Sequence, residues 1–163
     1  NKVLAVFKIP DKETVIPSGL TLALDSINDP GNLGTIIRLC DWFGIEQLIC
    51  SKDTVDCYNA KVVQASMGSL TRMNIIYTDL LDYFNDSSLP IFIADMDGKN
   101  VYNSKLPSEA ILIMGNEANG VSKEVEAVIT EKISIPRFGD LQATESLNVA
   151  TATAILLSEF SRN

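Results

Sequence analysis

Three polar loops hold the side chains with which this chain could do chemistry. The first reads Asn28-Asp29-Pro30-Gly31-Asn32-Leu33-Gly34, with Arg38 following in the next helical turn. The second runs from Gly115 to Gly120 through Asn116 and Glu117, and the third leads from Arg137 to Ser146-Leu147-Asn148. Histidine is absent from the sequence, which removes His-activated nucleophiles and the commonest zinc ligand. Any chemistry must therefore use Asn, Asp, Glu, Ser, Arg or a bound cofactor, and we expect no metal.

The common nucleotide-binding signatures do not match these loops. The GxGxxG pattern is missing after every predicted strand, which argues against a dinucleotide site. The second loop has the GxxxxG spacing, but Val121-Ser122 follows it instead of the Lys and Ser/Thr of a phosphate-binding P-loop.

Short apolar runs alternate with amphipathic segments along the chain, and this alternation predicts the elements that carry the three loops. We predict strands at Leu20 to Leu24, Gln47 to Cys50, Asn74 to Tyr77, Ile91 to Ala94, Ala110 to Met114 and Lys132 to Ile135. We predict helices at Leu33 to Phe43, Ala60 to Ser66, Leu80 to Phe84, Ser122 to Ile129 and Leu147 to Phe160. The pattern indicates an α/β fold with a mainly parallel sheet and helices on both faces. Ligands bind such sheets at the carboxyl ends of the strands, where the three loops lie.

Length and composition are those of one globular domain. The chain has 163 residues, of which 46% are apolar and 21% are charged. No apolar run approaches the roughly 20 residues of a membrane span, and no signal peptide opens the sequence. We therefore expect a cytoplasmic protein that is not bound to a membrane. Residues 1–19 are typical of an arm or linker, from which an upstream domain could have been removed, and residues 20–163 form the expected domain. The three cysteines have no CxxC spacing, which favours buried thiols over disulfides.

Taken together, the three loops resemble the motifs of the SpoU (TrmH-type) family of RNA ribose methyltransferases, within the SPOUT class. The resemblance covers about residues 22–160, and three motifs in order at strand ends are far more specific than one. It implies an enzyme that transfers a methyl group from S-adenosylmethionine to a ribose 2′-hydroxyl of tRNA or rRNA. It also implies a C-terminal deep trefoil knot that binds the cofactor, and a homodimer with active-site groups from both subunits.

The resemblance also assigns roles to individual residues. It implies catalytic roles for Arg38, Asn32, Glu117, Ser146 and Asn148, and a cofactor site of Gly115, Asn116, Ile135 and Leu147. Arg38 and Arg137 are the expected contacts to RNA, with Lys61 and Arg72 as further candidates.

Ordinary structural roles compete with several of these assignments. Arg38 could be a salt-bridged or snorkelling side chain, and Arg72 a surface charge. Asn32 and Ser146 each suit the N-cap of a helix. Ile135 and Leu147 have the character of core residues.

The formal net charge of −8 argues against a surface that attracts RNA as a whole. Local basic groups, or a further domain, would have to supply the affinity. The alternatives are a catalytically inactive RNA-binding or assembly protein with the same knotted fold, a flavodoxin-like nucleotide-binding module, and a knotted enzyme that methylates guanine N1. The sequence leaves the RNA, the nucleotide and the proton acceptor open.

Overall fold

Six strands of the described residues form one parallel sheet in the order β3-β2-β1-β5-β4-β6. The computed structural model describes residues 4–9, 19–139 and 146–162. The strands are β1 (Leu20–Leu24), β2 (Gln47–Ser51), β3 (Asn74–Thr78), β4 (Ile91–Asn100), β5 (Ala110–Met114) and β6 (Glu131–Ser134). The predicted parallel sheet is confirmed, and the largest departure is β4, which continues well beyond the apolar run that marked it.

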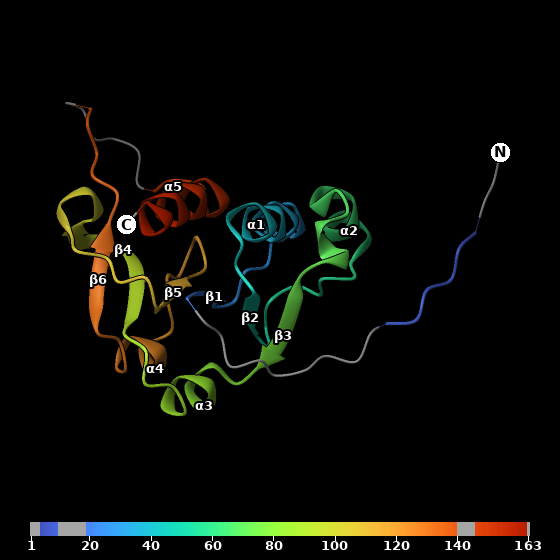
Figure 1. Ribbon diagram of the computed structural model, residues 1–163, viewed down its shortest axis with the longest axis horizontal. Helices are drawn as coiled ribbons and strands as arrows, with labels where there is room; N and C mark the ends of the chain where they lie inside the picture. Colours follow the sequence, from blue (N-terminus) through green and yellow to red (C-terminus); the bar gives the residue numbers. More distant parts are fainter. Residues whose placement is uncertain (1–3, 10–18, 140–145, 163) are drawn as a thin grey trace.

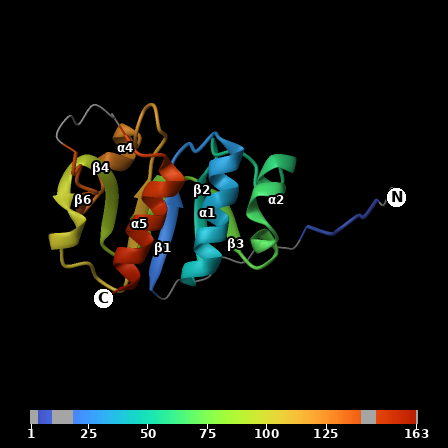
Figure 2. The same ribbon diagram turned by 90° about the horizontal axis from the view of Figure 1, so that it is seen from above.

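Helices cover both faces of the sheet, as predicted. Helices α1, α2 and α5 lie side by side on one face, whereas α3 and α4 lie on the other (Figures 1 and 2). Their bounds are α1 (Pro30–Phe43), α2 (Ala60–Ser66), α3 (Leu80–Asn85), α4 (Lys123–Glu126) and α5 (Val149–Ser161). Helix α4 is shorter than predicted because the chain turns into β6, where the Thr130 N–H donates to the Ile91 carbonyl at 2.8 Å.

The two helical layers explain why the strands are apolar on both sides. Alternate side chains of β5 enter two different cores: Leu112 packs with α1 and α5, and Ile111 and Ile113 pack on the α3 and α4 side. All three side chains are fully buried. Burial of each contributes about 1.5–3 kcal/mol, so the sheet is held from both faces.

The three cysteines belong to this apolar interior. Cys40, Cys50 and Cys57 are buried free thiols, which confirms the prediction. Burial raises the pKa of the Cys40 thiol well above its usual range, and the thiol therefore stays protonated and unreactive at neutral pH.

Helix α1 begins one turn earlier than the apolar pattern indicated. Asp29 is its N-cap, with Oδ1 accepting from the Asn32 N–H at 2.8 Å, and Pro30 occupies the first helical turn. Proline fits there because the first N–H groups of a helix have no intrahelical partner. Gly44 ends the helix with φ 69°, and its N–H donates to the Cys40 carbonyl.

Gly34 fixes how closely α1 and α2 pack. A Cβ at this position would lie 2.5 Å from Ala65 Cβ and 2.9 Å from the Val62 carbonyl oxygen. Any larger residue must therefore separate the two helices.

We expect Gly34→Ala to lower the free energy of unfolding by about 1–3 kcal/mol, because overpacking outweighs the better helix propensity of alanine. Urea unfolding measures the change. The control is Gln64→Ala at an exposed position of α2, which should stay within about 0.5 kcal/mol of the wild type. Equal stability of Gly34→Ala and wild type would contradict the close approach.

Candidate active site

The carboxyl ends of β4, β5 and β6 open into a pocket with a volume of about 1430 Å³. Its walls come from the loops after these strands and from the segment that begins α5. Seven of the residues to which the resemblance assigned a site role line it: Gly115, Asn116, Glu117, Ile135, Arg137, Ser146 and Leu147. The structure therefore brings the second and third loops to one cavity. Residues 140–145, between these lining residues, lie outside the described residues.

The loop after β5 is closed on itself by Asn116. The Asn116 and Gly120 backbones exchange two hydrogen bonds of 2.8 and 2.9 Å. The Asn116 side chain donates to the Ser26 carbonyl at 2.8 Å and accepts from the Ala118 N–H at 2.9 Å. This loop is thereby tied to the end of β1, and its shape is set by its own hydrogen bonds.

Glycine is required at the two ends of this loop for different physical reasons. A Cβ on Gly115 would lie 2.4 Å from the Gly120 carbonyl carbon, so the close neighbour that excludes a side chain is the loop's own backbone. Gly120 has φ 69°, a left-handed conformation that glycine adopts without strain.

The apolar side of the pocket contains Ile135 and Leu147. Ile135 is partly buried against the main core, which fits both its predicted roles. Leu147 is 47% exposed, so its interpretation as a core residue is wrong. An exposed leucine on the wall of a pocket provides an apolar surface for a flat ring.

Three of the predicted catalytic residues form a hydrogen-bonded chain beside the pocket. The Asn148 Nδ2 donates to Asn32 Oδ1 at 2.9 Å, and the Asn32 Nδ2 donates to Glu117 Oε1 in a short contact. These residues come from the start of α5, the first turn of α1 and the loop after β5. The tertiary structure thus joins all three loops, although Asn148 and Asn32 are 116 positions apart.

The helix caps differ from those considered for the sequence. Asn148 caps α5, since its Oδ1 accepts from the Ala150 and Thr151 N–H groups at 3.1 and 3.2 Å. The interpretations of Ser146 and Asn32 as N-caps are therefore wrong: Ser146 is exposed on the pocket wall, and Asn32 follows the cap Asp29 by three positions. The amide of Asn32 is consequently available for the chain to Glu117.

Arg38 lies apart from the pocket, on the exposed face of α1. Within the described part of the chain it has no hydrogen bond or ion pair, so the salt-bridged interpretation does not hold. It lines a separate groove of about 620 Å³ together with Thr35, Trp42 and Met67. Among the described residues, Arg38 and the pocket therefore do not belong to one cavity.

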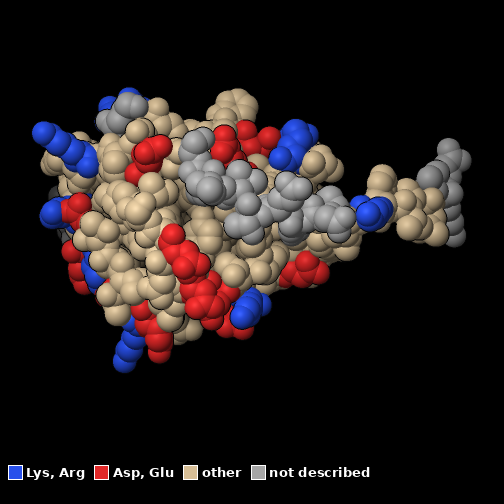
Figure 3. Space-filling view, turned by 60° about the horizontal axis from the view of Figure 1, so that its bottom comes forward, with Lys and Arg blue, Asp and Glu red and all other residues tan. Residues whose placement is uncertain are grey.

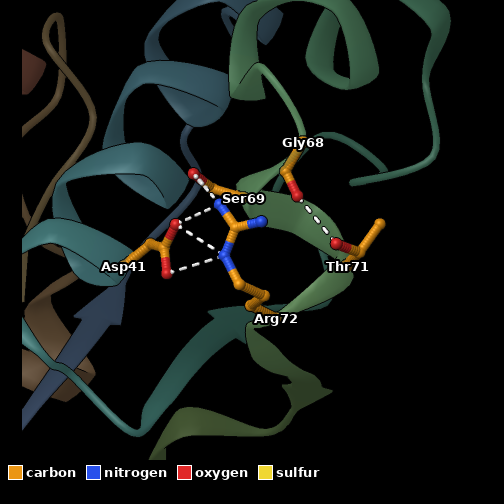
Figure 4. Close-up of polar contacts among 5 residues, drawn as sticks. All are labelled: Asp41, Gly68, Ser69, Thr71 and Arg72. Atoms are coloured by element: carbon orange, nitrogen blue, oxygen red, sulfur yellow. Dashed lines mark hydrogen bonds and ion pairs between the residues drawn. The ribbon is translucent and has the colours of Figure 1, made fainter.

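Arg72 is engaged elsewhere. Its Nε donates to both carboxylate oxygens of Asp41, at 3.2 and 3.1 Å, and its Nη2 reaches Ser69 Oγ at 3.4 Å (Figure 4). The hydrogen bond from Arg72 lowers the pKa of Asp41. This arrangement favours the interpretation of Arg72 as a surface charge.

Part of the pocket wall carried no signal in the sequence. Asp95, Met96 and Asp97 line the pocket from the middle of β4, just after the predicted strand had ended at Ala94. Lys132, which donates a hydrogen bond to Asp95, also belongs to no recognisable motif. Only the bend of β4 brings them to the site.

Comparisons with known proteins agree on one family. A model of the SpoU rRNA Methylase family matches residues 19–158. The chain is 29% identical over 160 residues to the 23S rRNA (guanosine(2553)-2′-O)-methyltransferase RlmP of Bacillus subtilis (strain 168), a match that covers 96% of this chain and 63% of that protein.

Solved structures give the same picture. A TrmH-family protein from Porphyromonas gingivalis superposes with a TM-score of 0.84 at 45% identity, covering 94% of this chain and 63% of that one. An AdoMet-bound rRNA methyltransferase from Sinorhizobium meliloti has a TM-score of 0.82 at 31% identity, covering 91% of this chain and 58% of that one. The chain spans less than two thirds of the length of each of these relatives.

The two bonds of Asn148 can be separated by mutation. Asn148→Ala should lower the free energy of unfolding by about 1 kcal/mol, because the cap of α5 is lost. Asn148→Asp keeps the capping oxygen and should stay within about 0.5 kcal/mol of the wild type, although it cannot donate to Asn32. Chemical denaturation of both variants checks this, and equal losses would contradict the capping role.

Proposed function

Because this chain belongs to the SpoU rRNA methylase family, we propose that it transfers a methyl group from S-adenosylmethionine to a ribose 2′-hydroxyl of RNA. The observation that carries the proposal is the juxtaposition of the pocket and the polar chain. Glu117 belongs to both, since it lines the pocket and accepts from Asn32. A catalytically inactive RNA-binding protein does not require a cofactor-sized cavity at this place.

The pocket residues fit the cofactor. The preformed loop from Gly115 to Gly120 offers backbone groups on one side, and Ile135 and Leu147 offer apolar contacts on the other. We infer that Gly115, Asn116, Ile135 and Leu147 hold the adenosine part. When bound, S-adenosylmethionine supplies the methyl group on a sulfonium. The AdoMet-bound relative from Sinorhizobium meliloti supports this choice of cofactor.

The polar chain is suited to orienting the acceptor. In our proposal the Glu117 carboxylate accepts a hydrogen bond from the ribose 2′-hydroxyl, while Asn32 holds that carboxylate in place and Asn148 holds Asn32. Ser146, exposed on the wall, offers a further hydroxyl. Holding two reactants at near-attack distance supplies about 7–11 kcal/mol, so positioning is the main contribution expected of these residues.

Arg38 and Arg137 are the proposed contacts to RNA phosphate. Arg137 lies at the pocket, with its Nη2 3.0 Å from Met96 Sδ. The face of the molecule that carries α3 is unsuited to RNA phosphate, because acidic side chains gather near its middle and basic ones lie mostly toward its edges (Figure 3). Because the net charge is −8, we expect RNA to bind where local basic residues, Arg38 and Arg137, are exposed. Whether the substrate is tRNA or rRNA stays open, and the curated relative supports rRNA.

We also propose that two copies form a homodimer through the outer face of α1, so that Arg38 serves the pocket of the partner. Trp42 and Met67, which share the groove with Arg38, are 84% and 73% exposed, and Trp, Met and Arg are enriched at protein interfaces.

Light scattering should give about twice the 17.8 kDa of one chain, and Trp42→Glu should shift the mass toward a monomer. The control Lys61→Glu, on the exposed start of α2, should leave the dimer intact. A monomeric wild type at about 50 μM would reject the dimer, since stable interfaces have Kd values well below this.

Three further expectations remain proposals. We propose that residues 1–19 form an arm and residues 20–163 the domain, and the exposure of residues 4–9 agrees with this division. The C-terminal trefoil knot is supported by the likeness to the TrmH-family structure. A cytoplasmic location is proposed from the sequence. In the described part of the chain no helix is long and apolar enough to cross a membrane.

Arg38→Ala tests the function. Titration calorimetry should show saturable S-adenosylmethionine binding, with one site per subunit, for wild type and variant alike. Methyl transfer to rRNA, measured as ribose methylation by mass spectrometry, should fall at least about a hundredfold in the variant, because a misplaced reactant costs this much. Lys105→Ala, at an exposed position that does not line the pocket, serves as the matched control. Absent cofactor binding by the folded wild type would favour the inactive alternative.

A further inference from the structure

A four-residue insertion in β4 builds one wall of the pocket. Strand β4 pairs with β6 up to Ala94, opposite Ile133, and the pairing resumes at Lys99, again opposite Ile133. Residues 95–98 are therefore displaced from the ladder as a bulge. Asp95, Met96 and Asp97 from this bulge line the pocket. Irregularities of this kind redirect side chains, and proteins place them next to sites.

The far end of the bulge is anchored by close backbone packing. A Cβ on Gly98 would lie 2.5 Å from the Ile133 carbonyl carbon, so only glycine allows this approach to β6. Ser134 Oγ also donates to the Gly98 carbonyl at 2.8 Å. These contacts attach residue 98, but they do not hold Asp95 at the pocket end.

The pocket end of the bulge is held by the Lys132 ammonium. Lys132 Nζ donates to Asp95 Oδ2 at 2.8 Å and, in a short contact, to Glu126 Oε1 of α4. The hydrogen bond from Lys132 lowers the pKa of Asp95, and the two carboxylates raise the pKa of Lys132. The Lys132 and Asp95 side chains are partly buried, with 35% and 29% of their surfaces exposed, whereas Glu126 is exposed at 43%. One cation thus joins β6, the bulge and α4.

Asp95 and Glu126 both line the pocket, whereas Lys132 does not. Without the ammonium, two carboxylates would face each other across the wall, and like charges in a partly buried place repel. We propose that Lys132 is a positioning residue for the methyl donor: it holds the wall formed by Asp95, Met96 and Asp97 in the shape that binds S-adenosylmethionine. The inference rests on the proposed function.

Lys132→Met tests the proposal against a matched control. Lys99 lies on β4, the strand that pairs with the β6 strand of Lys132. It forms an ion pair with Glu131, its side chain is 75% exposed, and it does not line the pocket. We expect Lys132→Met to weaken S-adenosylmethionine binding about tenfold or more by titration calorimetry, because small displacements in a site have effects of this size. Lys99→Met should stay within about twofold, since exposed ion pairs contribute little.

The kinetic signature separates positioning from general destabilisation. Lys132→Met should raise KM for S-adenosylmethionine by the same factor while kcat at saturation stays near the wild-type value, and Lys132→Arg should restore most of the affinity. If Lys132→Met does not fold, Asp95→Asn leaves the Lys132–Glu126 pair in place and should weaken binding at least about threefold.

Two results would overturn the proposal: binding by Lys132→Met equal to that of Lys99→Met, or, where only Asp95→Asn folds, wild-type affinity of that variant. Failure of the folded wild-type protein to bind S-adenosylmethionine would instead reject the proposed function.

Discussion

The parallel pairing of β1 with β5 is the interaction on which the site depends. It puts Leu24 opposite Met114, and the Asp25 N–H continues the ladder to the Met114 carbonyl at 2.9 Å. The loop that starts α1 therefore leaves the sheet beside the loop that follows β5. Asn32 and Glu117 meet for this reason, and the amide of Asn116 closes the same junction by donating to Ser26.

Asn148 shows how one side chain can serve both the fold and the site. Its oxygen caps α5 and its nitrogen donates to Asn32. Helix α5 packs against α1 in the main core, so the position of the amide is set by two helices that are themselves buried against the sheet. Structural and catalytic roles are therefore compatible at this residue. At Gly115 the backbone of Gly120 lies too close for a side chain, and this close backbone packing also keeps the pocket loop compact.

The pocket is formed by two kinds of structure. On one side a short loop is shaped by its own backbone hydrogen bonds and by Gly120. On the other, a strand departs from its ladder and is held by an ammonium between two carboxylates. The first kind leaves a motif because glycine and asparagine are required at defined positions. The second leaves none, since a lysine on β6 is in itself an ordinary residue.

The sequence by itself determined the parallel sheet, the helices on both faces and the three loops at the strand ends, because apolar periodicity and turn residues are local properties. It also indicated that the three cysteines are buried thiols. Only the tertiary structure decided which side chains touch. The chain from Asn148 through Asn32 to Glu117, the capping by Asp29 and Asn148, the exposure of Leu147 and the wall held by Lys132 all depend on strand order and register. These couple residues far apart in the chain, and no local pattern records such contacts.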